Sequence, residues 1–518
     1  MPSGRTDPEE LTTLPRLQCH TSRSGHTGPD QGERAAVGVR KVSRMSDQPT
    51  RRPRVIIIGS GFGGLFAAQA LADEPVEVTV IAKTSHHLFQ PLLYQVATGI
   101  LSPGEVAPAT REILAAHQNT EVVLGTVRSI DVGSRTVSVS ILGLQYDYDY
   151  DYLIVAAGSV TSFFGNDHFA HDAPGMKNID DALELRGRIY GAFELAEISA
   201  ARGEDEDAAR LMTFVVVGAG PTGVEMAGQL VELSKRTLER EFRHIAPQDA
   251  RIVLMDGGDC VLSSFHPSLQ AKAQAELEEM GVEVRLGAMV NEVDELGLDY
   301  RGPDGENHRI EAVTKVWAAG VTASPLAALL AEQVGLEVDR GGRLPVNDDL
   351  TLAGHPEVFA VGDMVAHDEV PGVAQGAIQS ARHAAAQIAR AVEGKPESRP
   401  FTYFDKGNMA TIARFRAIAE VGSVRVTGFT AWTMWLVVHL FYIIGFKSQV
   451  TTLLHWAVTF VGRDRAQRTI TEQQVFGRLA MEQDDRRLPE AMGRIMRPMG
   501  AARRPVADET VDEPADQG

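Results

Sequence analysis

The sequence predicts an α/β protein, and two glycine-rich turns of the same design carry that prediction. Residues 55–58 and 214–217 are short aliphatic runs, and each leads into a G-x-G-x-x-G turn and then into an apolar stretch of helical pattern. In such a turn the first glycine permits the tight bend, the second admits a pyrophosphate and the third allows close helix–strand packing. The freed N–H groups and the helix dipole then receive the phosphates. Two such units in one chain indicate two Rossmann-like dinucleotide-binding domains.

Length and composition limit the architecture and the partners. A chain of 518 residues can bury several cores, so two or three domains are expected. The formal net charge of −19 argues against nucleic acid as a partner, because phosphate binding needs a basic surface. The two cysteines, Cys19 and Cys260, form no C-x-x-C motif, so neither a local dithiol centre nor a cysteine-bound metal is expected. Any electron transfer must therefore run through an organic cofactor.

Residues 1–53 form a polar stretch that we expect to be a disordered tail. They are rich in Gly, Ser, Arg and Pro and lack apolar periodicity. The stretch has no continuous apolar run typical of a secretory signal, and its acidic residues argue against a mitochondrial presequence. The strand pattern begins soon after Met45, which makes that methionine a candidate for the biological start.

The first unit continues in a β-α-β pattern. Its expected elements are a strand over 55–58, a helix over 65–72, and strands over 76–81, 121–124, 146–152 and 153–158. In the stretch 146–152 tyrosine and aspartate alternate, which predicts a strand with its aspartates on one solvated face rather than a metal site. His86 and His87 are adjacent in an extended segment and point to opposite sides, so no metal site is expected there either.

The second unit repeats the plan. Its expected elements are strands over 214–217, 251–256 and 316–320, with an extra helical excursion around 230–248. A short buried strand over 358–363, a helix over 372–392 and a linker over 396–400 follow.

The C-terminal part differs in character. Residues 431–446 are almost wholly apolar, but a helix of that length is too short to cross a ~30 Å hydrocarbon core. A helical stripe follows, made of Val450, Leu453, Leu454, Ala457, Val458 and Val461. Three of the four tryptophans lie here (Trp432, Trp435, Trp456), and three arginines follow (Arg463, Arg465, Arg468). This pattern favours amphipathic helices lying in a membrane interface, although a core helix pair or a dimer interface would also explain it.

These residues resemble the type II NADH:quinone oxidoreductases, the single-subunit NADH dehydrogenases that do not pump protons. The most specific stretch runs from His86 to Gly99, HHLFQPLLYQVATG. The other matching motifs are GAGPTGVE at 218–225, WAAGV at 317–321, VGD at 361–363 and AQGAIQ at 374–379. The resemblance covers roughly 54–470, and it identifies the first unit as the FAD domain and the second as the NADH domain.

The resemblance implies a division of the chain. The expected parts are the tail 1–53, the FAD-binding domain over 54–175 and again over 323–400, the NADH-binding domain over 176–322, a membrane-anchoring region over 401–472 and a polar tail over 473–518. It also implies a set of cofactor-binding residues across both units. These are Gly59, Gly61, Phe62, Gly63, Gly64, Lys83, Gln95, Ala157, Gly158, Gly218, Gly220, Gly223, Asp256, Ala319, Gly320, Gly362, Asp363, Ala374 and Gln375.

Two of these positions bear on the ribose and ribityl contacts of FAD. The second strand of a Rossmann unit usually ends in an acidic residue, but here it ends in Ala82 followed by Lys83, so Lys83 or backbone must replace that contact. Asp363 matches the flavin-ribityl contact of the family, with a helix N-cap as the alternative.

In the second unit, Asp256 ends the second strand, where a carboxylate accepts the adenosine 2′-hydroxyl and repels a 2′-phosphate. NADH is therefore expected over NADPH, and the alternative is an aspartate that only shapes the turn.

Three residues are expected to be catalytic. The resemblance places Glu225 near the nicotinamide and flavin, with simple dipole complementarity in the first helical turn as the alternative. Gln375 and Gln379 share a helix face and match a pair near the flavin and the quinone, with surface glutamines as the alternative.

The expected reaction is hydride transfer from NADH to FAD and then transfer of two electrons to a membrane quinone of the respiratory chain, without proton pumping. The expected partners besides these are membrane lipids, with a homodimer as an open alternative. The expected place is the cytoplasmic face of a bacterial cell membrane, with a mitochondrial setting as the alternative. A sulfide:quinone oxidoreductase would need redox cysteines near the flavin, and Cys19 in the tail together with Cys260 cannot supply them. A soluble flavoprotein reductase of a protein electron carrier, or a flavin- and NADH-binding sensor, remains an alternative.

Overall fold

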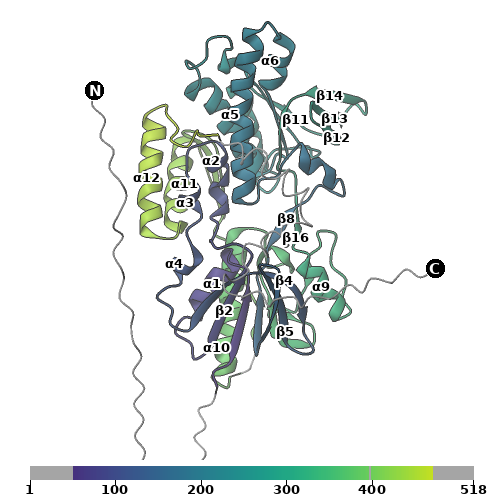
Figure 1. The fold of residues 1–518 in the computed structure, drawn as a ribbon, viewed down its shortest axis with the longest axis vertical. Helices are drawn as coiled ribbons and strands as arrows, with labels where there is room; N and C mark the ends of the chain where they lie inside the picture. The colour runs from purple at the N-terminus through teal and green to yellow at the C-terminus, as the bar shows by residue number, and fades with distance from the viewer. Residues whose placement is uncertain (1–50, 396–397, 471–518) are drawn as a thin grey trace, which may run out of the picture. The chain divides into compact units, whose positions relative to one another are not determined.

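The structure is a computed structural model in which residues 51–395 and 398–470 are described (Figure 1). The chain divides between Arg51 and Arg52, and the fold reported below is that of the unit beginning at Arg52. The predicted polar tail over 473–518, Met45 and nearly all of the predicted N-terminal tail lie outside the described residues.

A six-stranded sheet forms the core of the first unit. Its order is β18-β19-β7-β1-β2-β3, with β18 antiparallel at one edge and the other strands parallel. The strands are β1 (Arg54–Ile58), β2 (Glu77–Ala82), β3 (Thr120–Leu124), β7 (Tyr152–Val155), β18 (Thr351–Leu352) and β19 (His355–Ala360). Helices α1 (Phe62–Ala70) and α10 (Ala374–Val392) pack against each other and against this sheet. The strand β1 is buried nearly throughout, as expected for a parallel sheet that is covered on both faces.

A four-stranded parallel sheet forms the core of the second unit, in the order β11-β10-β9-β15. Its strands are β9 (Thr213–Val217), β10 (Arg251–Met255), β11 (Val282–Arg285) and β15 (Thr314–Trp317), and its helices are α5 (Ile179–Ala201), α7 (Pro221–Glu232) and α8 (Pro267–Met280). The long helix α5 was not predicted. It begins with a capping box in which Asn178 and Asp181 accept each other's backbone N–H groups.

Each unit carries a three-stranded antiparallel sheet. The first unit has β4 (Thr126–Asp131), β5 (Thr136–Ile141) and β6 (Leu144–Asp149), and the second has β12 (Met289–Asp294), β13 (Gly297–Arg301) and β14 (Asn307–Glu311). The smaller elements are α2 (Leu93–Ala97), α3 (Pro103–Val106), α4 (Thr110–Ile113), β8 (Ser159–Thr161), α6 (Asp205–Leu211), β16 (Val321–Ala323), α9 (Leu326–Gln333), β17 (Leu344–Pro345) and β20 (Val365–Ala366). Short 3-10 turns are η1 (Gln90–Leu92), η2 (Asp167–His171), η4 (Pro247–Asp249) and η5 (Gly362–Met364), and η3 (Leu233–Thr237) is a π-helical turn.

The C-terminal segment comprises a small sheet and two helices. Its elements are β21 (Asn408–Ala413), β22 (Arg416–Val421), β23 (Val424–Thr427), α11 (Gly428–Tyr442) and α12 (Phe446–Val461). Strand β21 packs against α7. Helices α11 and α12 contact each other, as Figure 1 shows at the yellow-green end of the chain. Among the described residues, no helix is long and apolar enough to cross a membrane.

Two expectations about local structure were wrong, and a third held only in part. The alternating stretch 146–152 is not one strand, because β6 ends at Asp149 and β7 begins at Tyr152. Between them Asp151 accepts a hydrogen bond from the backbone N–H of Arg54, 2.7 Å away, which starts the pairing of β7 with β1. The expected helical excursion around 230–248 is helical only in part, at the end of α7, in the π turn η3 and at the start of η4.

The apolar stretch 431–446 is also not a single helix. Helix α11 ends at Tyr442, Ile443 is extended, and Gly445 adopts a φ of +94° before α12 begins at Phe446. A positive φ is accessible to glycine at little cost, so Gly445 makes the break that periodicity alone does not reveal.

One glycine allows α7 and β21 to approach closely, and this contact can be tested. A Cβ on Gly228 would lie 1.6 Å from the carbonyl oxygen of Ile412, so Gly228→Ala should separate the two elements and destabilise the protein by about 3 kcal/mol. Gly191 in α5 is a matched control, because nothing lies within 4 Å of its added Cβ. Gly191→Ala should stabilise the protein by ~0.5–1 kcal/mol. Urea unfolding of both variants checks this; equal effects of the two substitutions would contradict the packing.

Candidate active site

The two glycine-rich turns form matching cradles. Gly59 and Gly218 adopt φ values of +107° and +106°, in the region that favours glycine. A Cβ on Gly64 would lie 1.8 Å from the carbonyl oxygen of Gly59, and one on Gly223 would lie 1.8 Å from that of Gly218. The third glycine of each turn therefore allows the helix to sit on the turn.

The second glycine of each turn faces open space. Gly61 and Gly220 are the N-caps of α1 and α7, they have no side-chain cap, and nothing lies within 4 Å of a Cβ added to either one. The first backbone N–H groups of both helices are therefore free for an anionic ligand. These cradles fit the pyrophosphates of two dinucleotides.

The first cradle is extended by residues at the ends of neighbouring strands. Ala157 and Gly158 follow β7, and Gly158 has a φ of +64° with open space on its Cβ side. Phe62 and Gly63 begin α1, and Gly63 lies close to Ala156. Strand β2 ends in Ala82, which is buried, and exposed Lys83 follows it. Neither residue is acidic, so no carboxylate lies at this strand end to bind a ribose.

Asp363 lies in η5 beside the first cradle. Its Oδ2 accepts a hydrogen bond from Oγ of Ser159 at 2.8 Å and lies 3.6 Å from Nζ of Lys177. The N-cap of α10 is Val373, so the alternative that Asp363 caps that helix does not hold. Gly362, with a φ of +74°, directs the turn that carries Asp363.

Asp256 follows β10 at the second cradle. Its Oδ2 accepts the backbone N–H of Ala219 at 2.6 Å, and its Oδ1 accepts that of Gly258 at 2.7 Å. The carboxylate thus ties the glycine-rich turn to the loop after β10. On the other side of β9, Ala319 and Gly320 follow β15, and the phenyl ring of Phe164 covers Gly320.

Glu225 is buried in α7, at 8% exposure. It lies beyond the first helical turn, which contains no acidic residue, so simple dipole complementarity does not explain it. The backbone N–H of Thr411 lies 3.4 Å from its Oε1. Burial raises the pKa of Glu225 to about 8, and the nearby N–H groups of Thr411 and Trp435 oppose this only in part. The carboxyl is therefore largely protonated at neutral pH.

The two glutamines of α10 differ in their surroundings. Gln375 lies in the first turn, after Ala374, and its buried Oε1 has no hydrogen-bond partner. Gln379 exchanges two hydrogen bonds of 3.0 Å with the backbone of Phe404. Gln375 thus has a free acceptor for a ligand, whereas the amide of Gln379 holds the chain that leads to β21.

Both polar atoms of the Gln95 side chain have a partner within the protein. It is 2% exposed, its Nε2 donates to the hydroxyl of Tyr94 at 3.1 Å, and its Oε1 accepts from Nε1 of Trp456 at 2.7 Å. Its side chain joins α2 to α12, and Nε2 keeps a second N–H beyond the one given to Tyr94.

The tryptophans and arginines of the C-terminal segment lie elsewhere than expected. Trp432, Trp435 and Trp456 are 7%, 1% and 2% exposed, so they form the core under α11 and α12 rather than an interfacial belt. Arg463 and Arg468 pair with Glu239 and Glu241. Arg465 is 5% exposed and donates to the carbonyl oxygens of Thr98 and Gln229 and to Oε1 of Gln229.

Three functional candidates were missed in the sequence. Ser159 and Lys177 converge on Asp363, and Tyr94 is a buried phenol whose pKa is raised well above its usual value by burial and by nearby Glu225. Tyr94 lies within the distinctive stretch from His86 to Gly99, which is a signal that could have found it. No motif spacing indicates Lys177.

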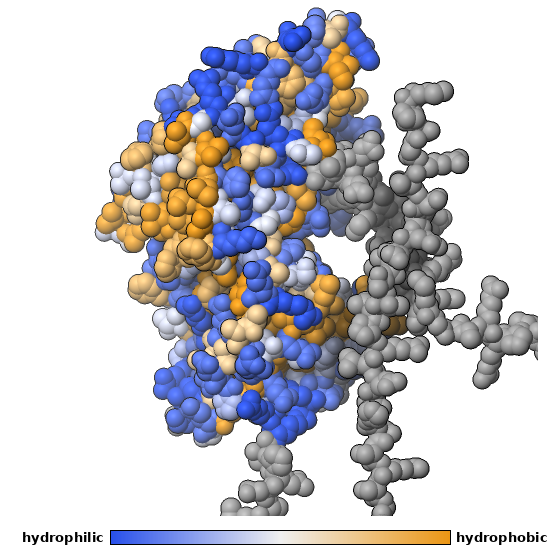
Figure 2. Space-filling model, turned by 60° about the vertical axis from the view of Figure 1, so that its left-hand side comes forward, coloured by the Kyte–Doolittle hydropathy of each residue, from blue (hydrophilic) through white to orange (hydrophobic). Residues whose placement is uncertain are grey.

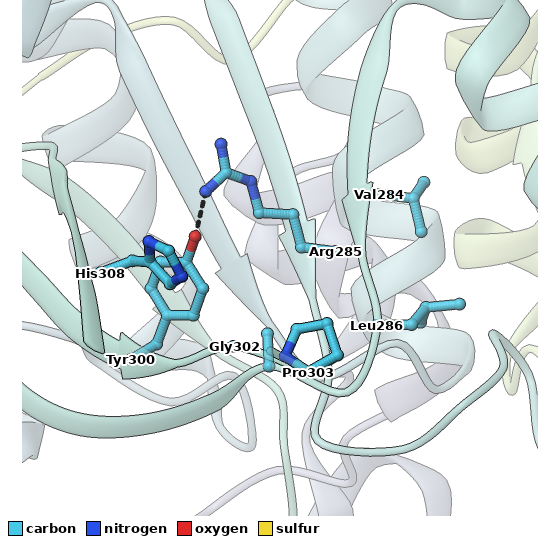
Figure 3. Close-up of a pocket in the computed structure, with 8 residues that line it drawn as sticks. Val284, Arg285, Leu286, Tyr300, Gly302, Pro303 and His308 are labelled. Carbon is cyan, nitrogen blue, oxygen red and sulfur yellow. Dashed lines mark hydrogen bonds between the residues drawn. The ribbon is translucent and has the colours of Figure 1, made fainter. Parts of the chain in front are cut away.

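A cavity of about 280 Å³ lies at the end of β11, where the backbones of its lining residues Arg285 and Ala288 hydrogen-bond to that of Asp256 (Figure 3). Its lining includes Arg285, the last residue of β11, and Tyr300 of β13. The guanidinium of Arg285 donates a hydrogen bond to the Tyr300 hydroxyl. None of the predicted site residues lines this cavity. Within the parts of the chain that the structure describes, no group of three or more His, Cys, Asp or Glu residues could hold a metal ion.

The raised pKa of Glu225 predicts how stability depends on pH. Between the ordinary carboxyl pKa and about 8, the folded state holds a proton that the unfolded state has released, so the free energy of unfolding falls by up to about 1.4 kcal/mol per pH unit as pH rises. Glu225→Gln removes this titration. Its stability relative to wild type should therefore increase steadily from pH 5 to pH 8 in urea unfolding.

Glu279→Gln is the control for this experiment. Hydrogen bonds from Arg416 hold the pKa of Glu279 below its usual range, so that carboxylate is ionised in both states above pH 5. The difference between Glu279→Gln and wild type should stay constant over the same range. A constant difference for Glu225→Gln as well would rule out the protonated carboxyl.

Comparisons with known proteins agree with this geometry. The family model for pyridine nucleotide-disulphide oxidoreductases matches residues 53–387. The chain is 54% identical over 448 residues to the type II NADH:quinone oxidoreductase Ndh of Mycobacterium tuberculosis, covering 86% of this chain and 96% of that protein. It is 28% identical over 388 residues to the type II NADH:quinone oxidoreductase of Staphylococcus aureus, covering 73% and 92%.

A solved structure shows the same fold. The NDH2 of Plasmodium falciparum in complex with NADH superposes with a TM-score of 0.72 at 19% identity, covering 80% of this chain and 99% of that one. The sulfide:quinone oxidoreductase of Aquifex aeolicus shares the fold at a TM-score of 0.61 and 16% identity. With the α/β fold, the paired cradles and the sequence match over nearly all of a curated relative, the chain belongs to the type II NADH:quinone oxidoreductases of the pyridine nucleotide-disulphide oxidoreductase family.

Proposed function

We propose that this protein oxidises NADH and passes two electrons through FAD to a quinone at a membrane surface, as a NADH dehydrogenase of the respiratory chain that pumps no protons. The observation that carries the proposal is the 54% identity across 96% of a type II NADH:quinone oxidoreductase, in a chain whose two phosphate cradles are both intact. Each cradle requires glycines at fixed positions, and this chain has all of them. The similarity in sequence is therefore accompanied by the residues that would bind both dinucleotides.

The first cradle would hold FAD, which supplies the two-electron carrier between NADH and quinone. Gly59, Gly61 and Gly64 would take the pyrophosphate. Asp363 would accept a ribityl hydroxyl, since one of its oxygens is held by Ser159 and Lys177. Phe62, Gly63, Ala157, Gly158, Gly362 and Ala374 would form the walls, whereas exposed Lys83 is a candidate for the ribose end. Gln95 would contribute the second N–H of its Nε2, since Tyr94 takes only one of the two.

The second cradle would hold NADH. Gly218, Gly220 and Gly223 would take its pyrophosphate, and Ala319 and Gly320 would line its nicotinamide half. The carboxylate of Asp256 already accepts two backbone N–H groups, and each oxygen retains a lone pair for a ribose hydroxyl. A 2′-phosphate beside this carboxylate would be repelled, so NADH is favoured over NADPH.

Glu225, Gln375 and Gln379 would serve the transfer to quinone. Glu225 would hold a proton at its carboxyl near neutral pH, where a reduced quinone needs one. Gln375 would offer its unpaired Oε1 as a hydrogen-bond acceptor at the start of α10, whose positive end favours negative charge. Gln379 would act by holding Phe404 and the chain behind it.

The membrane-facing surface would be the outer face of α11 and α12, which we call the apolar face. Its exposed residues are Phe429, Val437, Phe441, Phe446, Val450, Leu453, Leu454, Val458 and Val461. Figure 2 shows hydrophobic side chains gathered on this side of the molecule. Patches of this kind mark interaction sites in soluble domains. Peripheral association of this face with the cytoplasmic side of a cell membrane would bring the quinone to the protein, and a homodimer is the competing occupant.

The domain division follows from these assignments. We propose FAD-binding parts over 54–175 and 323–400, an NADH-binding domain over 176–322 and a membrane-anchoring region over 401–472.

The reaction is tested by an anaerobic visible spectrum of the purified protein. NADH should bleach the flavin band, an equal amount of NADPH should bleach it far more slowly, and a short-chain quinone should restore it. Bleaching without restoration by quinone would move the acceptor to a protein carrier, and an unchanged flavin band would overturn the proposal.

Membrane association is tested by sedimentation with phosphatidylcholine–phosphatidylglycerol vesicles. Leu453→Asp/Leu454→Asp places two charges on the apolar face and should lower the bound fraction at least about tenfold, because each leucine contributes ~1.5–3 kcal/mol when buried. Leu195→Asp/Ile198→Asp on α5 is the matched control, since these residues are 53% and 46% exposed. Equal binding by both variants would contradict the assignment, and loss of a dimer in light scattering would favour the homodimer.

A further inference from the structure

Lys177 lies in the segment that crosses from the first unit to the second, and its backbone is firmly held. Two residues earlier, Gly175 pairs with Trp317 of β15, and the Trp317 N–H donates to the carbonyl oxygen of Pro174 at 2.9 Å. The N–H of Lys177 donates to Oδ2 of Asp181 at 2.8 Å, next to the capping box of α5. Lys177 is thus carried by backbone that β15 and α5 of the second unit hold in place.

Its ammonium faces a carboxylate that a third part of the chain also holds. Nζ lies 3.6 Å from Oδ2 of Asp363 in η5, and Oγ of Ser159 in β8 donates to the same oxygen at 2.8 Å. The side chain of Lys177 is 19% exposed and that of Asp363 is 27% exposed. The pair is therefore neither at the open surface nor sealed in the core.

The pair is incompletely satisfied by the protein. In the described ranges, Asp363 is the only ion-pair or side-chain hydrogen-bond partner of the Lys177 ammonium, which has three donors, and Oδ1 of Asp363 has no partner. Burial lowers the pKa of Lys177, and the charge of Asp363 opposes that effect. A charged pair that is half-buried with unused donors and acceptors is costly unless a further polar group meets it.

The place where that polar group would sit is the first cradle. Ser159 directly follows Gly158, which has open space on its Cβ side, and Asp363 directly follows Gly362, whose φ is +74°. Both glycines were predicted cofactor contacts, so Lys177 stands behind a carboxylate that borders the predicted FAD site.

We propose that Lys177 is a positioning residue of the FAD site. Its ammonium orients the Asp363 carboxylate for the cofactor and places a fixed positive charge near the bound FAD. The inference rests on the proposed function, because it presumes FAD in the first cradle. Without Lys177 the Asp363 carboxylate would have no opposite charge beside it and would turn toward solvent or another donor. FAD gains negative charge on reduction, so loss of the ammonium should also disfavour its reduced state.

The test compares Lys177→Met, Lys177→Arg and wild-type holoenzyme. FAD release is followed by the rise in flavin fluorescence on dilution, and the midpoint potential by reductive titration against a reference dye, both without NADH or quinone. Lys177→Met should raise the Kd for FAD at least about tenfold and shift the potential to more negative values. Lys177→Arg keeps the charge and should restore most of both properties.

Lys395→Met is the matched control, because Lys395 is exposed and pairs with Glu393 at 3.1 Å. It should leave the Kd and the potential unchanged. An unchanged Kd and potential in Lys177→Met would overturn the inference while the proposed function stood. The inference would also be overturned if Lys177→Met and Lys177→Arg both folded but neither retained FAD. Lys177→Arg keeps the positive charge and should therefore restore FAD binding. Absence of flavin from the wild-type protein would instead defeat the proposed function.

Discussion

The structure depends on two places where a helix can lie directly on the turn before it. At Gly64 and Gly223 a single added carbon would sit 1.8 Å from a carbonyl oxygen, well inside any permissible contact. Because no side chain is present, α1 and α7 start immediately behind β1 and β9, and their first N–H groups open onto Gly61 and Gly220. The binding of two dinucleotides is thus a consequence of backbone packing, and few side chains are needed to build either cradle.

The helix α7 then links the second cradle to the C-terminal segment. Gly228 lets β21 approach so closely that Thr411, next to Ile412, brings its N–H within 3.4 Å of the Glu225 carboxyl. The same close contact keeps water from Glu225 and raises its pKa to about 8. One turn later, Arg465 binds Gln229 and ties the end of the C-terminal segment to the same helix. The protonation state of the proposed catalytic carboxyl is therefore set by packing between segments nearly two hundred residues apart.

Local features were predictable from the sequence, and features that depend on distant contacts were not. The glycine turns and the parallel strands follow from motifs whose physical meaning is local. The burial of Trp435 and Trp456 was not predicted, because composition does not reveal which face of a helix meets the body of the protein. Lys177 escaped notice since its significance comes only from its approach to Asp363, which is far away in sequence. The break at Tyr150 required knowledge that Asp151 binds Arg54.

The two faces of α12 explain how an apolar surface can persist on a folded protein. The inner face is satisfied by specific contacts: Trp456 donates to Gln95, and Nδ1 of His455 lies 2.7 Å from Oε1 of Glu105. Turning the helix over to bury Leu453 and Leu454 would break these polar contacts, leave their partners unpaired and expose Trp456 in place of the leucines. The outer face must therefore remain outward until another apolar phase covers it. Trp435 of the adjacent α11 lies over Glu225, so on the proposed function the elements that meet the bilayer also close the site where the quinone would be reduced.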